Sequence, residues 1–331
     1  MAEKLSKRER IQAALADQEV DRVPIAFWGH FAADPRTADE IAGETLTFQR
    51  RFEWDFVKLM PSGMYFCQAL GCEITPAAGP GGVNALATSV IAGPGDWARL
   101  PLLDPANGWL AEHVESTRRV RAELGPAVPI IQTLFSPITI AHKLSLNNSF
   151  GSYVRKHRDE LDEGLARITR SSIDFAGATL DAGADGFFYA TQEATLDELT
   201  EPEFAELGKR YDREVLTAIG EGAWLNLLHV CRESIMADMV ADYPVAGINW
   251  DSHNNFPSLE QAPKLWRQAL VGGLDRHGAI LKGTPGEVEA ATRAAVESVG
   301  GRHLIVSAGC ALPLARPDAN LDAARRAVGA L

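Results

Sequence analysis

The chain has 331 residues, of which 46% are hydrophobic and 23% charged, and its formal net charge is −12. This composition is typical of a soluble globular protein, and the acidic balance argues against nucleic-acid binding because no basic excess is available to neutralise phosphates. The chain has no run of about 18 apolar residues, so we expect no membrane-spanning helix. Residues 1–10 are charged and hold no apolar stretch, so we expect no signal peptide and a cytoplasmic location.

Short apolar strands alternate with helices along the chain. The first helix is predicted over residues 6–17, where Ser6 and Glu9 have the spacing of a capping box. The predicted strands cover residues 25–28, 55–60, 128–135, 186–190, 223–230, 245–251, 269–275 and 303–307. The predicted helices after them cover residues 37–52, 107–124, 138–146, 149–157, 159–182, 202–220, 234–241, 258–265, 285–299 and 318–328. Residues 73–104 are rich in Gly and Pro and predict an inserted hairpin with loops.

Eight strands that alternate with helices favour a parallel sheet closed into a (β/α)8 barrel, the TIM-barrel architecture. The length and the absence of a linker predict one domain over residues 1–331, with the insertion near 73–104. In such barrels the chemistry lies at the carboxyl ends of the strands. We therefore looked for reactive side chains at those ends.

Two thiols and one imidazole stand where predicted strands stop. A single residue separates His229 from Cys231, so in an extended segment their side chains point the same way. Cys310 follows the last predicted strand and must reach the other two across the mouth of the barrel. Thiolates and imidazole are zinc ligands, and three protein ligands leave one position open. The alternative is a hydrogen-bonded histidine at a strand end with small buried cysteines.

Four other residues have weaker patterns. Glu193 lies beyond a predicted strand and is a candidate for a fourth, displaceable zinc ligand, or is a solvated loop acid. Asp251 ends a predicted strand and is a candidate to orient a ligand through a hydrogen bond. Cys67 and Cys72 lie in a mostly apolar segment with a spacing that is unusual for paired ligands, so we expect a structural role for both.

The chain resembles the uroporphyrinogen decarboxylase superfamily over nearly its whole length and, within it, the cobalamin-dependent methyltransferases. The segments that carry this resemblance are residues 7–15, 21–24, 68–71, 136–139, 183–186, 273–275 and 304–310. The decarboxylases hold their substrate carboxylates with an Arg-Gln-Ala-Gly-Arg segment after the first strand, where this chain has residues 27–31. Their catalytic aspartate aligns with Ser62, or with Gly63 after a one-residue slip, and Cys310 stands where they have a histidine. These departures argue against decarboxylation of a tetrapyrrole.

The methyltransferase branch has a His-x-Cys pair at one strand end and a cysteine at the last, which His229, Cys231 and Cys310 match. This resemblance implies a zinc ion that activates a small acceptor thiol as thiolate, and methylcobalamin carried by a partner corrinoid protein. Coenzyme M, homocysteine or another thiol fits as acceptor. Lys58 and Arg232 are the candidates to bind the sulfonate of coenzyme M.

The resemblance also implies a surface for cobalamin or substrate at the barrel mouth. Trp28, His30 and Tyr189 are candidates to line it, with side-chain packing as the alternative for the aromatic residues. A decarboxylase or lyase of the same fold, and a corrinoid- or tetrapyrrole-binding protein without activity, remain the alternative functions. The sequence leaves the oligomeric state open.

Overall fold

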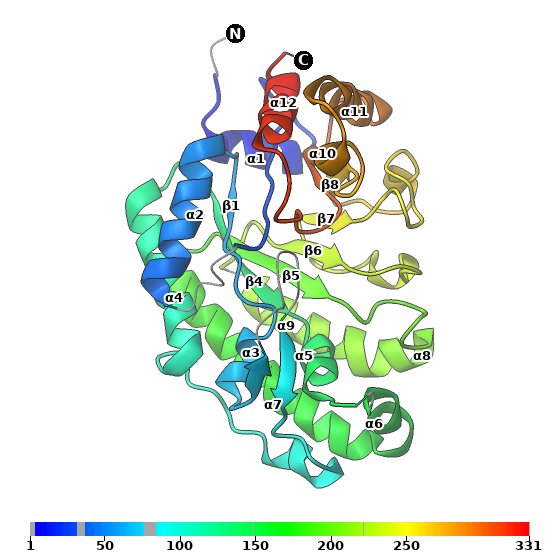
Figure 1. Ribbon diagram of the computed structural model, residues 1–331. Helices are drawn as coiled ribbons and strands as arrows, with labels where there is room; N and C mark the ends of the chain where they lie inside the picture. Colours follow the sequence, from blue (N-terminus) through cyan, green and yellow to red (C-terminus); the bar gives the residue numbers. More distant parts are fainter. Residues whose placement is uncertain (1–3, 32–36, 76–83, 148, 221, 331) are drawn as a thin grey trace.

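The computed structural model describes residues 4–31, 37–75, 84–147, 149–220 and 222–330. Seven parallel strands form its main sheet in the order β1-β4-β5-β6-β7-β8-β9 (Figure 1). These strands are β1 (Val57–Lys58), β4 (Ile130–Phe135), β5 (Gly186–Thr191), β6 (Leu227–Val230), β7 (Gly247–Trp250), β8 (Ala269–Leu274) and β9 (Leu304–Ala308). The predicted α/β barrel class is therefore confirmed, although β1, β4, β6, β7 and β8 are shorter than the apolar runs suggested.

Residues 25–28 were predicted as a strand, but the structure has an irregular segment there, at the eighth position of the barrel. Ile25 forms a single parallel bridge with Val306 of β9. On the other side, the amide of Asp55 donates to the carbonyl of Ile25 at 3.0 Å. Pro24 has no N–H to donate, so this segment makes too few ladder bonds to form a regular strand. It nevertheless lies between β9 and the residues that lead into β1.

Helices surround the strands (Figure 1). They are α1 (Lys7–Leu15), α2 (Ala38–Phe52), α3 (Tyr65–Ala69), α4 (Gly108–Leu124), α5 (Pro137–Leu144), α6 (Phe150–Lys156), α7 (Arg158–Asp181), α8 (Glu201–Phe204), α9 (Arg210–Gly220), α10 (Ala279–Lys282), α11 (Pro285–Ser298) and α12 (Asp318–Gly329). The capping box of Ser6 and Glu9 is present at α1. A π-helical turn, Ala205–Lys209, joins α8 to α9. Helix α2 packs on α4, α4 on α7, α7 on α9, and α11 on α12, which forms the outer layer.

The outer layer lacks regular helices after β6 and β7, where helices over residues 234–241 and 258–265 were predicted. The structure has only the short 3-10 helices Asp238–Val240 and Ala262–Lys264 there. Ser234 has a φ of 50°, a left-handed conformation that interrupts a right-handed helix at its start. Pro263 removes a backbone donor within the second segment. Both segments are therefore long loops at the carboxyl end of the barrel.

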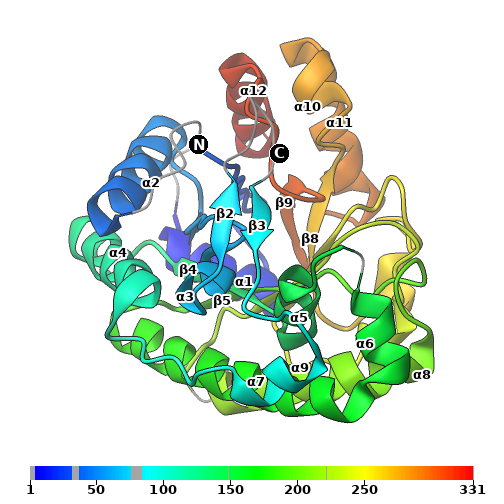
Figure 2. The ribbon, with the colours of Figure 1, turned by 60° about the horizontal axis from the view of Figure 1, so that its bottom comes forward.

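The segment predicted as an insertion carries a separate two-stranded sheet (Figure 2). Strands β2 (Glu73–Thr75) and β3 (Ala85–Thr88) pair antiparallel, and a 3-10 helix, Pro94–Arg99, follows. Residues 76–83, between the two strands, lie outside the described part of the chain. Among the described residues, no helix is both long and apolar enough to cross a membrane.

Candidate metal centre

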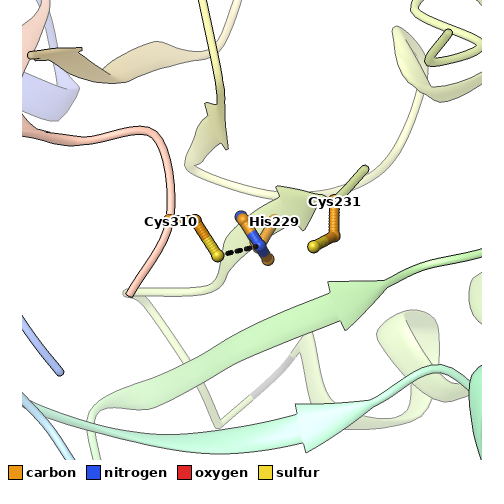
Figure 3. A group of neighbouring side chains, drawn as sticks. All are labelled: His229, Cys231 and Cys310. Carbon is orange, nitrogen blue, oxygen red and sulfur yellow. Dashed lines mark hydrogen bonds between the residues drawn. The ribbon is translucent and has the colours of Figure 1, made fainter. Parts of the chain in front are cut away.

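His229, Cys231 and Cys310 come together at the carboxyl ends of β6 and β9. His229 lies in β6 and Cys231 directly follows it, while Cys310 follows β9. Two strands, β7 and β8, separate β6 from β9 in the sheet, so Cys310 approaches from across the barrel interior. The ligand atoms of the three residues all lie within 4.8 Å of one another. Figure 3 shows the imidazole between the two cysteines, with both sulfurs pointing toward it.

A glycine before Cys310 permits this approach. A Cβ atom on Gly309 would lie 2.5 Å from the Cα of Asp251 and 2.9 Å from the carbonyl oxygen of Trp250. Real Cβ atoms do not come so close to backbone, so only glycine allows the end of β9 to pass this near the end of β7. The close passage sets the position of Cys310 against β6.

A buried amide fixes the tautomer of His229. Asn249 lies opposite His229 in the β6–β7 register, and its Nδ2 donates to the carbonyl oxygens of Val271 at 2.7 Å and Ala308 at 3.0 Å. Its Oδ1 must therefore face the Nδ1 of His229, which donates to it at 2.7 Å. The lone pair of a neutral imidazole is then on Nε2, the atom that lies 3.5 Å from the Sγ of Cys310.

The two cysteines differ in how readily they ionise. A hydrogen bond from the thiol of Cys231 to Cys310 raises the pKa of Cys231 well above its ordinary value. The same bond lowers the pKa of Cys310 well below its ordinary value, with help from the charge of Arg276, although burial opposes the shift. Of the two sulfurs, that of Cys310 is thus the one that accepts the shared hydrogen bond.

These donors fit a zinc ion. In a tetrahedral site with Zn–S near 2.3 Å and Zn–N near 2.0 Å, donor atoms are separated by about 3.5 to 3.8 Å. The contact between Cys310 and His229 already has the 3.5 Å separation, and the third donor lies within 4.8 Å of both. Facing lone pairs on sulfur and nitrogen favour a cation between them. The group contains no carboxylate oxygen among the described residues.

Cationic side chains surround the two cysteines, although the chain as a whole is acidic. The charge of Arg276 acts on both thiols, and its Nη1 donates to the carbonyl of Ala311 at 3.3 Å. Burial lowers the pKa of Lys143, and the negative charges of its neighbours, Cys231 among them, oppose that shift. Burial also lowers the pKa of Lys58, to about 7, against the charge of Cys310. Three basic side chains, Lys58, Lys143 and Arg276, thus lie within electrostatic range of the cysteines.

Comparisons with known proteins identify the family of the chain. Residues 6–331 match the uroporphyrinogen decarboxylase (URO-D) family. The chain belongs to the URO-D family. In solved structures, it is similar to a methyltransferase from Methanosarcina mazei, with a TM-score of 0.84 and 21% identity over 98% of both chains. It is also similar to a B12-independent methionine synthase from Shewanella sp. W3-18-1, with a TM-score of 0.61 and 14% identity over 93% of this chain and 92% of the other.

Two curated relatives are methyltransferases. The methylcobamide:CoM methyltransferase MtaA of Methanosarcina barkeri is 24% identical over 96% of this chain and 95% of its own length. The methylcobamide:CoM methyltransferase MtbA of Methanosarcina mazei is 22% identical over 95% of each chain. Within the URO-D family, the chain is therefore similar to methyltransferases, as the resemblance in sequence predicted.

The structure gives Glu193 three polar partners on neighbouring elements. The Glu193 carboxylate is buried. It accepts a hydrogen bond from the Thr139 hydroxyl and lies 2.9 Å from the Nδ1 of His142. The Nη2 of Arg232 lies 3.6 Å from the same carboxylate. Glu193 is therefore not a solvated loop acid. A role as the fourth ligand stays a prediction, and it requires the carboxylate to exchange at least one of these partners.

Asp251 and Tyr189 make their hydrogen bonds outside the cluster. The carboxylate of Asp251 accepts from the amide of His253 at 3.2 Å and from Asn254 at 2.9 Å, which stabilises the turn after β7. The hydroxyl of Tyr189 donates at 2.7 Å to Asp212 in helix α9, and the side chain is fully buried. The bond to α9 directs Tyr189 toward the helices, so the structure does not bring it to the three ligands.

The aromatic residue of β5 that does reach the cluster is Phe188, which sequence analysis missed. Its ring stacks on the imidazole of His229 with centroids 5.0 Å apart. Trp28 is buried beside it, with ring centroids 4.8 Å apart. His30 lies on the surface. Successive side chains of a strand point to opposite faces, so the choice between Phe188 and Tyr189 depended on which face is the interior.

Proposed function

We propose that this URO-D protein is a zinc-dependent methyltransferase that moves a methyl group between methylcobalamin on a corrinoid protein and a small thiol. The observation that carries the proposal is the convergence of His229, Cys231 and Cys310 within 4.8 Å. The similarity to methylcobamide:CoM methyltransferases supports the same reaction class.

The side chains of the site have separate tasks in this proposal. His229, Cys231 and Cys310 would hold the zinc ion, and Asn249 presents the Nε2 lone pair of His229. When bound, the zinc ion would lower the pKa of the acceptor thiol, so that its sulfur attacks the methyl group as a thiolate. Glu193 is the proposed oxygen donor that the acceptor displaces, with Asp251 fixing the turn beside it.

The basic side chains near the cysteines favour an acceptor that carries an acidic group. Lys143 and Arg276 act by charge on the cysteines, and their position was not anticipated from the sequence. Arg232, one of the two candidates for binding a sulfonate, already pairs with Glu198 at 2.6 Å. A sulfonate thiol of the coenzyme M type fits such surroundings, because an anion is stabilised by cations in a partly buried site. Homocysteine, which carries a carboxylate, remains compatible.

Cobalamin is proposed to arrive on a partner. The described residues build one barrel, in keeping with a single domain over residues 1–331, and this domain is filled by its own core. Trp28 and His30 remain proposed contacts for the corrinoid or substrate. Tyr189 remains a weaker proposal because its hydroxyl faces Asp212. A cytoplasmic location likewise stays a prediction.

A decarboxylase of the same fold is the alternative that the basic groups favour. Such an enzyme needs several cations at the mouth to bind substrate carboxylates, and Lys58, Lys143 and Arg276 are basic side chains near the cysteines. These cations nevertheless face two cysteine thiols rather than an open carboxylate pocket, and Ser62 accepts a hydrogen bond from Asn84 at 3.1 Å where the decarboxylases have an aspartate. Methyl transfer therefore explains more of the site.

Thiol-dependent demethylation of free methylcobalamin tests the proposal. We expect the purified protein with zinc to convert methylcobalamin to cob(I)alamin when 2-mercaptoethanesulfonate or homocysteine is added, followed by visible absorption under anaerobic conditions. The demethylation rate of Cys310→Ala should be at least about 100-fold lower, because the substitution removes a proposed zinc ligand. Cys72→Ala is the matched control and should keep the rate. A wild-type protein that is inactive with both thiols, or a Cys310→Ala variant as active as wild type, would contradict the proposal.

A further inference from the structure

Lys58 is a buried cation beside the cluster that takes no part in holding a metal. It ends β1 and is 7% exposed. Its Nζ contacts the Sδ of Met60 at 2.8 Å and lies 4.6 Å from the ring centroid of Phe188 and 5.9 Å from that of Trp28. Among the described residues, no carboxylate forms an ion pair with it. Aromatic faces and a thioether have replaced the water that a surface lysine would bind.

The surroundings of Lys58 make its charge costly unless a negative group lies near. Burial lowers the pKa of its amine to about 7, and Cys310 is the group whose negative charge opposes that shift. Phe188 connects the two parts of the site, because the same ring also stacks on His229 at 5.0 Å. The amine and the imidazole of His229 therefore both contact the ring of Phe188, which places the amine beside the cluster.

We propose that Lys58 is a positioning residue whose ammonium group balances the negative charge of the acceptor sulfur. The inference rests on the proposed function and deepens it. Two cysteine thiolates neutralise a divalent cation, so the sulfur of the acceptor brings one negative charge in excess. In an apolar site a single positive charge within several ångströms stabilises that excess. The cation acts on the sulfur itself, whatever the rest of the acceptor carries.

This proposal distinguishes Lys58 from a residue that binds the acidic end of the acceptor. A cation near the acidic end would favour sulfonate or carboxylate thiols only. A cation near the sulfur favours every thiol by the same factor. Arg276 and Lys143, whose charges act on Cys231, are then the candidates to bind the acidic end of the acceptor.

Binding of thiols to the Co²⁺-loaded protein provides the test. Co²⁺ in place of zinc gives visible bands, and a bound thiolate adds a charge-transfer band in the near ultraviolet, so sulfur binding is measured without turnover. Wild type, Lys58→Met and Lys58→Arg are titrated with 2-mercaptoethanol, which has a neutral end, and with 2-mercaptoethanesulfonate, which has an anionic end. Unfolding midpoints and Co²⁺ stoichiometry establish that each variant is folded and loaded.

We expect Lys58→Met to bind Co²⁺ as wild type does, and its apparent Kd for both thiols to rise by the same factor, about tenfold or more. Lys58→Arg keeps the charge and should restore most of the affinity. Unchanged Kd values in Lys58→Met would overturn the inference, as would a loss confined to the sulfonate. A wild-type protein that takes up no Co²⁺, or that shows no thiol-dependent band, would instead overturn the proposed function on which the inference rests.

Discussion

The tautomer of His229 is decided by one amide, that of Asn249, which is not itself a proposed ligand. Two carbonyl oxygens can only accept hydrogen bonds, so they orient the Asn249 amide with its oxygen toward Nδ1. His229 then offers the Nε2 lone pair toward Cys310 without rearrangement. A partner that holds a ligating imidazole in this way contributes to affinity because the ligand needs no reorganisation when the metal binds.

Replacing Asn249 should therefore weaken the metal site more than the fold. Asn249→Leu keeps the size of the side chain but removes the acceptor of Nδ1, and we expect zinc affinity to fall by about 10- to 100-fold. Competition with a chromophoric chelator measures this change. Asn226→Leu is the matched control, because Asn226 is also buried and accepts from the amide of Phe187. Asn226→Leu should lower stability and leave zinc affinity unchanged, and equal losses of zinc affinity in the two variants would contradict the role of Asn249.

The three proposed ligands could be named from the sequence, whereas their supporting residues could not. His229, Cys231 and Cys310 are recognisable by chemistry and by their place at strand ends. Asn249 acts from the neighbouring strand, and its effect depends on a cross-strand register that one sequence does not reveal. Its visible signal was a polar residue inside the otherwise apolar run at residues 245–250. Phe188 was missed because strand periodicity alone does not say which face lines the barrel.

At the scale of elements, the ends of β7 and β9 determine where Cys310 lies. Gly309 passes so close to Trp250 and Asp251 that an added methyl group has no room. Gly309 therefore contributes to the metal site by allowing the close backbone contact that positions Cys310. Gly272, in β8, makes a useful contrast, since a Cβ there would meet its nearest atom at an ordinary 3.7 Å.

Gly309→Ala should displace Cys310 and Gly272→Ala should not. A clash of 2.5 Å with backbone must move one strand end by a substantial part of an ångström, and we expect zinc affinity to fall at least about tenfold. Gly272→Ala should bind zinc within a factor of about two of wild type. Isothermal titration with zinc compares the two variants. Wild-type affinity in Gly309→Ala would show that the close passage does not position Cys310.

The regular elements were predictable where apolar periodicity was strong, and the loops were not. Helices α2, α4, α7 and α11 lie close to their predicted bounds. The predicted helices after β6 and β7 were wrong because local backbone conformation, such as the left-handed Ser234, overrode a weak pattern. These loops are held instead by bonds between neighbours, for example from the amide of Leu196 to the carbonyl of Ser234 at 3.0 Å.

For the whole molecule, the barrel brings together residues that are 81 positions apart, as His229 and Cys310 are. Neither β6 nor β9 forms a site alone, and the strands between them set the distance across the interior. The acidic chain also concentrates Lys58, Lys143 and Arg276 around the cysteines. The net charge of the chain therefore gives no information on the charges around the site.

The zinc content of the purified protein tests the central claim most directly. Elemental analysis of the wild-type protein should find about one zinc ion per chain, and the Cys72→Ala control should keep it. His229→Ala, Cys231→Ala and Cys310→Ala should each retain much less after dialysis against a mild chelator, although they stay folded. A wild-type protein that contains no zinc, gains none on incubation and still transfers methyl groups to thiols would contradict the account.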